Sequence, residues 1–428
     1  MMKHTLIACA AVVASHQHTL ASDWIGGIGD WANPDNWSGN QLPGLIETVI
    51  ISNNGTAVIN GIDFTVGAGL FGQSAIGDGT DGGLAMYGGS LRFEDFGIAL
   101  FGRDQGTTGS LTLSDGASLY TQTSLELGWM GNANAVIDGG STVETELLRI
   151  GGRRDEPGRT FTSVATVDIA GHGTIVSTTN SIDQDGLVIG AGGSANVTVR
   201  EGALVDVTNG LLLSTTAAGS SLTIDGQDSI VRVDGTYFDT GRDVSLPNDH
   251  PEVGDARLTL RDGGTLDFSQ TSRNAIFASH TRIEGTGTIM GNASLFEGAV
   301  IDAGENQTYG HIEFIGQLDN SIAGGTLHFD IGSTQDFDRL SFSELIAGGT
   351  LEVSIAEDFV AAFGQSFDII TADMLTGDFD LVELPELQGS LYFEANIHAQ
   401  GVTISVVPAP SSALTLGMSL IILGRRRV

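Results

Sequence analysis

Short runs in which apolar and polar residues alternate cover much of the chain, and many of them end at an acidic residue followed by glycine. Leu111 and Leu113, for example, alternate with polar neighbours before Asp115 and Gly116. Residues two positions apart on a strand point to the same face, so each run predicts a strand with one buried face. The glycine supplies the positive φ that a sharp turn requires.

This unit of strand and turn recurs from residue 49 to about residue 310. Clear copies lie at 109–119, 135–143, 195–205, 221–226 and 257–266. The turn glycines recur at intervals of roughly 23 to 37 residues, the range expected of one solenoid coil lengthened in places by loops. Coils of this kind bury their apolar faces on one another. We therefore expect an all-β fold, a right-handed parallel β-solenoid.

Acidic-glycine pairs between short strands also favour β-hairpins, so an antiparallel sandwich or a propeller is the alternative architecture. The spacing of the turns is uneven, and the sequence has no Trp-Asp or kelch-like blade signature. Both observations count against a propeller and favour the solenoid.

Two segments of different composition flank the repeats, which we place at 49–324. Residues 22–48 contain Trp24, Trp31 and Trp37, three of the four tryptophans of the chain. We interpret this segment as an N-terminal cap over the open end of the solenoid, with a sugar-binding aromatic platform as the alternative. Residues 325–406 form a Phe-richer series of alternating strands, which we interpret as a C-terminal β cap.

Composition and charge limit the partners of the protein. The chain has 428 residues, of which 61 are glycine, and a formal net charge of −34. So many turn residues fit short strands better than helices. Because phosphate binding needs clustered cations, the charge argues against nucleic acid or an anionic membrane surface as a partner.

Residues 1–21 have the form of a secretory signal peptide. A lysine begins a short basic region, and an apolar run at 6–14 precedes small residues that end at Ala21 and Ser22. Cleavage between these two residues would remove Cys9, the only cysteine. The exported protein would then contain neither a disulfide bond nor a thiolate nucleophile.

The C-terminal segment, 407–428, differs from the rest of the chain. A proline-containing stretch precedes the short apolar run 411–424, and three arginines follow it. The run is shorter than the roughly 20 residues that a membrane-spanning helix needs. We expect a short hydrophobic helix that anchors weakly, with the arginines on the cytoplasmic side and the body of the protein outside.

This order of elements resembles the PEP-CTERM sorting signal of exported bacterial proteins. The resemblance implies recognition by an exosortase, a membrane enzyme of the transpeptidase type, in organisms that make exopolysaccharide. The glutamate that usually stands between the prolines is Ala409 here, a departure that bears on cleavage. The tryptophan pattern of residues 22–48 is similar to that of planctomycete-type PEP-CTERM and autotransporter-associated β-repeat proteins. The resemblance assigns the signal to Val407, Pro408, Pro410, Arg425, Arg426 and Arg427.

A polysaccharide lyase or hydrolase on a β-helix scaffold is the main alternative function, and a carbohydrate-binding protein is another. Enzymes of this kind combine clustered carboxylates with Arg, Lys or Ca²⁺. Here most aspartates occupy turn positions, and the histidines show no metal-ligand spacing. Those of the exported chain are His172, His250, His280, His311, His328 and His398.

We therefore assign no catalytic, cofactor-binding or metal-binding residues from the sequence. Residues 77–83 resemble one copy of a calcium-binding RTX repeat, which we interpret as a structural turn, with Ca²⁺ on the acidic surface as a weaker alternative. Residues 153–159 form the most charged stretch, which we interpret as an inserted surface loop, or alternatively as a grip for an acidic sugar.

The sequence favours a secreted or cell-surface protein with a structural or adhesive role in the bacterial envelope or exopolysaccharide matrix. Three carboxylates within reach of an arginine on one solenoid face would favour the enzyme instead. A smooth, regularly stacked surface would favour the structural role.

Overall fold

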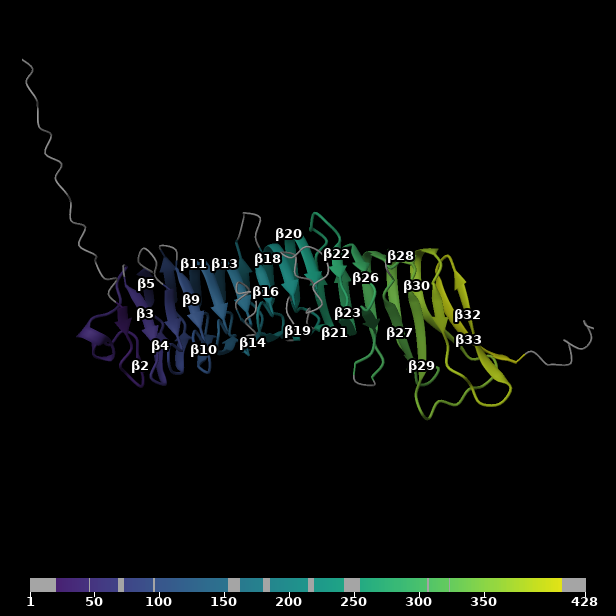
Figure 1. Cartoon of the computed structure of the whole chain (residues 1–428), viewed down its shortest axis with the longest axis horizontal. Helices are drawn as coiled ribbons and strands as arrows, with labels where there is room; N and C mark the ends of the chain where they lie inside the picture. Colours follow the sequence, from purple (N-terminus) through teal and green to yellow (C-terminus); the bar gives the residue numbers. More distant parts are fainter. Residues whose placement is uncertain are drawn as a thin grey trace, which may run out of the picture.

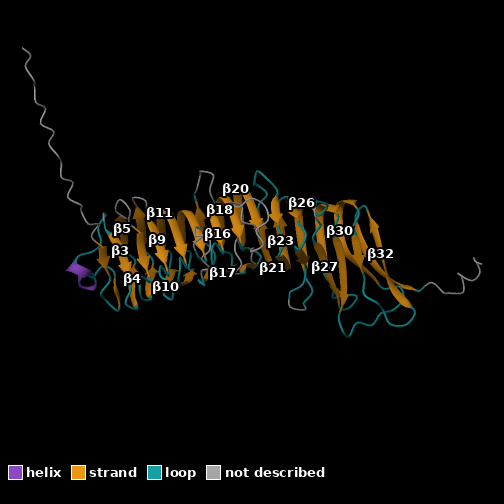
Figure 2. Cartoon of the chain, viewed as in Figure 1, coloured by secondary structure: helices purple, strands orange, loops and turns teal. Residues whose placement is uncertain are grey.

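The strands of the computed structural model stack into one elongated parallel β-solenoid of about 12 turns (Figure 1). The structure describes residues 21–45, 47–67, 73–94, 97–152, 162–179, 185–214, 219–241, 255–305, 308–322 and 324–409. Among these residues the helical elements are two single-turn 3₁₀ helices, η1 (Pro34–Asn36) and η2 (Ser38–Asn40), at the N-terminal end (Figure 2). The parallel solenoid expected from the alternation and the turns is therefore confirmed.

The strands are mostly short, as the closely spaced turns predict. In the N-terminal third they are β1 (Ala21–Asp23), β2 (Ile28–Asp30), β3 (Thr48–Ile51), β4 (Gly55–Asn60), β5 (Asp63–Gly67), β6 (Gln73–Ile76), β7 (Gly82–Tyr87), β8 (Ser90–Glu94), β9 (Ile98–Phe101), β10 (Thr108–Ser114), β11 (Ser118–Leu127), β12 (Asn132–Ile137) and β13 (Thr142–Ile150). In the middle they are β14 (Val164–Ala170), β15 (Ile175–Thr178), β16 (Leu187–Ile189), β17 (Ser194–Arg200), β18 (Leu204–Leu213), β19 (Ser220–Asp225), β20 (Ile230–Thr240), β21 (Ala256–Asp267), β22 (Ala275–Phe277), β23 (Thr281–Met290), β24 (Ala293–Leu295) and β25 (Val300–Asp302). In the C-terminal part they are β26 (His311–Asp319), β27 (Thr326–Ile331), β28 (Arg339–Ala347), β29 (Thr350–Ile355), β30 (Ser366–Gly377), β31 (Leu381–Glu383), β32 (Leu391–His398) and β33 (Gly401–Pro408).

Parallel pairing between successive coils produces long ladders along the solenoid. We call one of them ladder A; it runs through β2, β4, β7, β10, β12, β14, β17, β19, β21, β23, β25, β27, β29 and β31. Some long strands belong to two other ladders. The first half of β18, for example, pairs with β15, and its second half pairs with β16.

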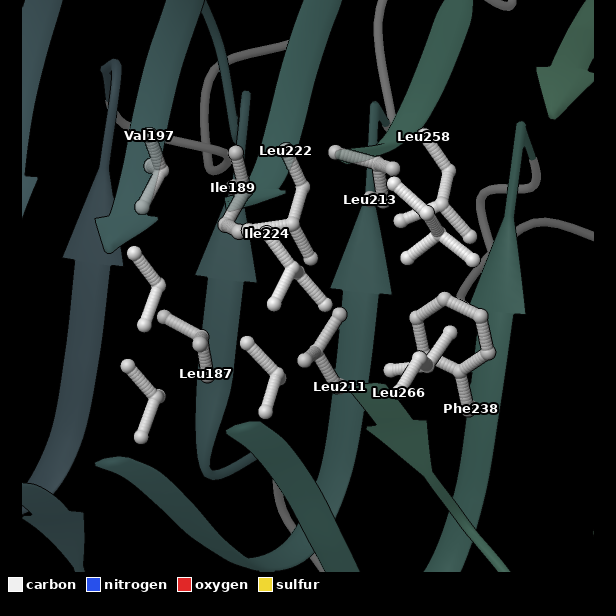
Figure 3. Close-up of a cluster of buried hydrophobic side chains, with 14 of the residues drawn as sticks. Leu187, Ile189, Val197, Leu211, Leu213, Leu222, Ile224, Phe238, Leu258 and Leu266 are labelled. Carbon is white, nitrogen blue, oxygen red and sulfur yellow. The ribbon is translucent and has the colours of Figure 1, made fainter. Parts of the chain in front are cut away.

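The core is a continuous column of apolar side chains inside the coils. In ladder A, Val197 lies opposite Leu222, and Leu222 lies opposite Leu258, so equivalent positions of three coils stack (Figure 3). Each of these side chains is at most 2% exposed. Full burial of one such aliphatic side chain stabilises the fold by roughly 1.5–3 kcal/mol. A coil without neighbours would lose most of that burial.

The turns have the backbone conformation that the acidic-glycine pairs predict. Gly116 has a φ of +75° and Gly202 a φ of +81°. The preceding residues, Asp115 and Glu201, also have positive φ, at +57° and +56°. Two successive residues in the left-handed region turn the chain sharply at the end of one strand and allow the next to begin within a few residues.

The three N-terminal tryptophans lie in the core. Trp24, Trp31 and Trp37 are 0%, 1% and 0% exposed, and they contact one another edge to face at centroid distances of 5.0 and 4.8 Å. Rings buried to this extent cannot present a face to a sugar, so they do not form the aromatic platform considered from the sequence. The segment that carries them also supplies β1 and β2, which pair in parallel with the strands of the next coil.

Parallel pairing continues across residue 325, where the composition changes. Strand β27 pairs in parallel with β25 and β29, and β29 pairs in parallel with β31, which ends at Glu383. The strand direction changes after this point, because β33 runs antiparallel to both β30 and β32. The phenylalanines of this region, such as Phe337 packed edge to face on Phe367, contribute to the core and leave the parallel ladder intact.

Candidate functional site

The residues expected to flank signal cleavage lie in the first strand. Ala21 is exposed and lies opposite Thr48 in the pairing of β1 with β3. Ser22 is 5% exposed, and its hydroxyl donates a hydrogen bond of 2.8 Å to Glu47 Oε2. Cleavage between them would leave Ser22, with a new ammonium group, beside an acidic side chain.

The described residues of the expected sorting signal lie at the end of the last strand. Val407 and Pro408 are opposite Tyr392 and Leu391 in the pairing of β33 with β32. The remaining positions, Pro410, Arg425, Arg426 and Arg427, lie outside the described residues, as does the expected C-terminal helix. No helix in the part of the chain that the structure describes is long and apolar enough to cross a membrane.

The acidic groups of residues 77–83 contact the next coil. Arg103 Nη1 donates to Asp78 Oδ2 at 3.0 Å, and the Thr108 N–H donates to Asp81 Oδ1 at 2.7 Å. These contacts agree with the interpretation of the segment as a structural turn. The charged stretch 153–159 lies outside the described residues.

Most described arginines pair with a carboxylate from another coil. These ion pairs connect neighbouring coils on the outer surface, whereas packing of the apolar column connects them in the interior. The pairs are Arg103–Asp78, Arg149–Glu126, Arg200–Asp168, Arg232–Asp206, Arg257–Glu284, Arg261–Glu305, Arg273–Asp239 and Arg282–Asp302.

One outward-facing row of ladder A becomes strongly charged towards the C-terminal end. Successive coils place Thr259 opposite Glu284, Glu284 opposite Asp302, and Asp302 opposite His328. The neighbouring positions Ile283 and Ile301 face the core and are fully buried. Alternation therefore directs the charged side chains to the outer face of the same ladder.

Arg282 joins the first two carboxylates of this row. Its Nε lies 2.9 Å from Glu284 Oε2, and its Nη2 contacts Asp302 Oδ2. The side chains of Glu284 and Asp302 are only 3% and 5% exposed. Thr259 Oγ1 donates to Glu284 Oε1 at 3.2 Å, and the Gly304 N–H donates to Asp302 Oδ1 at 3.1 Å. Both carboxylates are thus held by protein groups.

His328 connects Asp302 to a third carboxylate. Its Nδ1 lies 3.3 Å from Asp302 Oδ2, and its Nε2 lies 3.9 Å from Asp330 Oδ1. Asp330 follows two positions later on β27, and Ser354 of the next coil donates a hydrogen bond to Asp330 Oδ1. The side chain of His328 is 19% exposed and that of Asp330 is 34% exposed, so this end of the group reaches solvent.

The charges of the group perturb one another. The neighbouring carboxylate of Asp302 raises the pKa of His328, and this effect exceeds the lowering by burial. Burial would raise the pKa of Asp302, but His328, the Gly304 N–H and Arg282 together hold it below its ordinary value. Each partner therefore favours the charged form of the other.

Asp338 is fully buried and binds backbone groups next to Asp330. Its Oδ1 accepts the Gly310 N–H at 2.9 Å, and its Oδ2 accepts the Asp330 N–H at 2.8 Å. The pKa of Asp338 is raised to about 7, mainly by burial and further by the charges of Asp302 and Asp330. Asp338 fixes the backbone that carries Asp330.

Sequence reasoning missed this group. Asp302, His328 and Asp330 are the described acidic and histidine side chains whose ligand atoms gather closely enough to hold a metal ion. The one local signal is His328 and Asp330 two positions apart on an alternating strand, which places them on the same face. The partner Asp302 could be found only with the register of the coils.

Two carboxylates contact Arg282 and a third, Asp330, follows beyond His328 on the same solenoid face, which approaches the arrangement that would favour a polysaccharide-active enzyme. Only Asp330 among them is substantially exposed. The carboxylates of Glu284 and Asp302 are buried and already bind Arg282. An acid and base pair needs two carboxyl groups that reach the substrate. The group therefore fits an ion-pair network or a cation site better than a hydrolytic centre.

Comparison with known proteins does not assign the chain to a family, because no protein-family model matches it and no curated protein is significantly similar. Proposals about its function rest on the ladders, the charged group and the sequence motifs.

Proposed function

We propose that the protein is a secreted or cell-surface structural or adhesive component of a bacterial envelope or exopolysaccharide matrix. The observation that carries this proposal is the continuous stack of about 12 turns. A rod of stacked coils offers long regular faces and distributes load over many ladder hydrogen bonds. Most described arginines form ion pairs with carboxylates of other coils, so these ion pairs also join the coils of the stack.

Export and sorting follow from the two ends of the sequence. The signal peptide would be removed between Ala21 and Ser22, and the C-terminal segment would be recognised by an exosortase. The tail would hold the protein in the inner membrane before or in place of cleavage. Ladder pairing ends at Pro408, so release just beyond it would leave the strands complete.

The finer features of the fold belong to the same proposal. A right-handed coil agrees with the strong preference of parallel crossovers for that hand. The tryptophans of residues 22–48 would cap the N-terminal end, and the antiparallel β32 and β33 would cover the edge of β30 at the other end. Covered edges would prevent uncontrolled strand addition.

Intact mass tests the proposal directly. The protein would be recovered from the cell surface and the medium of its native host. A mass that begins at Ser22 and ends near Pro408 supports export and processing. A chain that ends at Val428 and stays in the inner membrane would show that the tail is a plain anchor. A chain that keeps residues 1–21 in the cytoplasm would refute the proposal.

The second candidate is a polysaccharide-active enzyme, favoured by the partly exposed Asp330 beside His328. The purified exported chain would be incubated with neutral and uronic-acid polysaccharides, and new reducing ends and unsaturated products would be measured. Product formation by the wild type that Asp330→Asn abolishes would favour the enzyme. No product, or equal product from both proteins, would argue against it.

A further inference from the structure

We propose that Asp302, His328 and Asp330 form a divalent-cation site that joins two neighbouring coils of ladder A. Asp302 ends β25 and lies directly opposite His328 on β27, and Asp330 follows on the same face of β27. One ligand atom from each residue lies within 4.8 Å of the other two. An ion held by all three would connect the coils through coordinate bonds.

The distances are close to those that an ion requires. Two donor atoms that each lie about 2.1 Å from one ion are at most about 4.2 Å apart. His328 Nδ1 is 3.3 Å from Asp302 Oδ2, and His328 Nε2 is 3.9 Å from Asp330 Oδ1. These two contacts use different ring nitrogens, whereas one ion takes only one of them. A set with one ligand atom from each residue spans up to 4.8 Å, so rotation of the side chains has to bring the three atoms slightly closer, without a change in ladder register.

The imidazole provides the nitrogen ligand of the site. His328 Nδ1 is buried and lies 3.3 Å from Asp302 Oδ2, but it does not have hydrogen-bond geometry to any described residue. An ion would replace this ion pair with coordinate bonds to the neutral imidazole and the carboxylate.

Charge points to the same conclusion. Four carboxylates lie along this face, and two described arginines, Arg257 and Arg282, accompany them. The carboxylates are those of Glu284, Asp302, Asp330 and Glu352, the last of which lies opposite His328 on the next coil. A dication offsets the excess of negative charge. Gly304 and Ser354 already donate hydrogen bonds to Asp302 and Asp330, so neighbouring groups orient both carboxylates.

The donor set selects the kind of ion. One imidazole nitrogen with two carboxylate oxygens suits Zn²⁺ or Mn²⁺, whereas Ca²⁺ takes six to eight oxygen ligands. Three protein ligands also leave coordination positions for water. We therefore expect zinc to bind more tightly than calcium at this site, in contrast to diffuse binding of calcium on an acidic surface.

Equilibrium dialysis of the full-length chain with zinc chloride tests the site. The protein is first stripped with a chelator, and the salt is kept at about 0.15 M to screen diffuse attraction to the acidic surface. We expect one tightly bound Zn²⁺ per chain, a higher melting temperature with zinc, and a shift of the His328 ring nitrogens in ¹⁵N NMR spectra. Excess calcium should not displace the zinc.

Two variants and a matched control decide the assignment. His328→Gln and Asp330→Asn should each weaken zinc binding at least about tenfold, whereas His398→Gln, which changes an exposed histidine of β32, should bind like the wild type. If His328→Gln does not fold, Asp330→Asn gives the same test at a partly exposed position. Absence of tight zinc binding to the wild type, or undiminished binding by the Asp330 variant, would overturn the proposal.

Discussion

Arg200 Nη2 lies 2.8 Å from Asp168 Oδ2, although the two residues are 32 positions apart in the sequence. They meet because β14 and β17 are neighbours in ladder A. The register places Asp168 opposite Thr198 and Ala170 opposite Arg200, so Asp168 and Arg200 are diagonal neighbours on adjacent strands. Similar pairs recur along the solenoid, so arginine is used here mainly between coils. The energetic value of each pair depends on how deeply its carboxylate is buried.

Arg282→Met should destabilise the protein much more than Arg232→Met. Removal of Arg282 leaves Glu284 and Asp302 buried with reduced compensation, which we expect to cost about 3 kcal/mol. The partner of Arg232 is Asp206, which is 33% exposed, so its loss should cost less than about 1 kcal/mol. Urea unfolding of the two variants measures both values, and equal losses would contradict the role of burial.

Trp37→Ala should destabilise the N-terminal end by about 3–5 kcal/mol. The ring is fully buried between Trp24 and Trp31, and its Nε1 donates a hydrogen bond of 2.8 Å to the Trp31 carbonyl. Ile28→Ala is the control, because Ile28 is 83% exposed and its loss should change stability by less than about 0.5 kcal/mol. Thermal unfolding followed by tryptophan fluorescence compares them. A near-neutral Trp37→Ala would show that the end is not packed as described.

Leu213→Ala should cost about 2–5 kcal/mol, since it opens a cavity in the middle of the core column (Figure 3). Leu213 lies opposite Ile189 on the preceding coil, and both side chains are fully buried. Val136→Ala provides the contrast, because Val136 is 39% exposed on the outer face of ladder A. Urea unfolding midpoints should separate the two variants clearly, and a similar midpoint would be inconsistent with this core.

Stability should fall in acid partly through Glu305. Arg261 holds the pKa of Glu305 below its ordinary value of 4.5. A carboxylate with a lowered folded pKa contributes stability that is complete above the unfolded pKa and is lost as the pH falls through the folded pKa. The wild type should therefore exceed Glu305→Gln in stability at pH 7, and the difference should shrink below about pH 4.5. Melting temperatures across this range provide the measurement; a constant difference would exclude this pair as a source of acid lability.

The local pattern of the sequence was enough to predict the strands and their buried faces. Leu111 and Leu113 are buried as the alternation requires, and Gly116 has the positive φ that the turn requires. These features depend on interactions between residues near one another in the chain. The change of composition at residue 325 is not accompanied by a change of strand direction, because phenylalanine can fill a core without changing the hydrogen bonds of a parallel ladder.

The charged group could not be predicted in the same way. Glu284 and Asp302 are neighbours across a short coil of 18 positions, whereas Asp302 and His328 are neighbours across 26 positions. Loops of different length make the coil period irregular, so spacing alone does not reveal which outward residues meet. Pairing between coils sets that register.

The sequence by itself thus determined the period-two strands, the sharp turns and the stacking of coils, because each follows from local alternation and backbone freedom. The tertiary structure decided that Asp302, His328 and Asp330 share one face and that the tryptophans are buried. The physical reason is that register across coils is fixed by the joint burial of apolar side chains and the hydrogen bonds of the ladders, which act over long sequence separations.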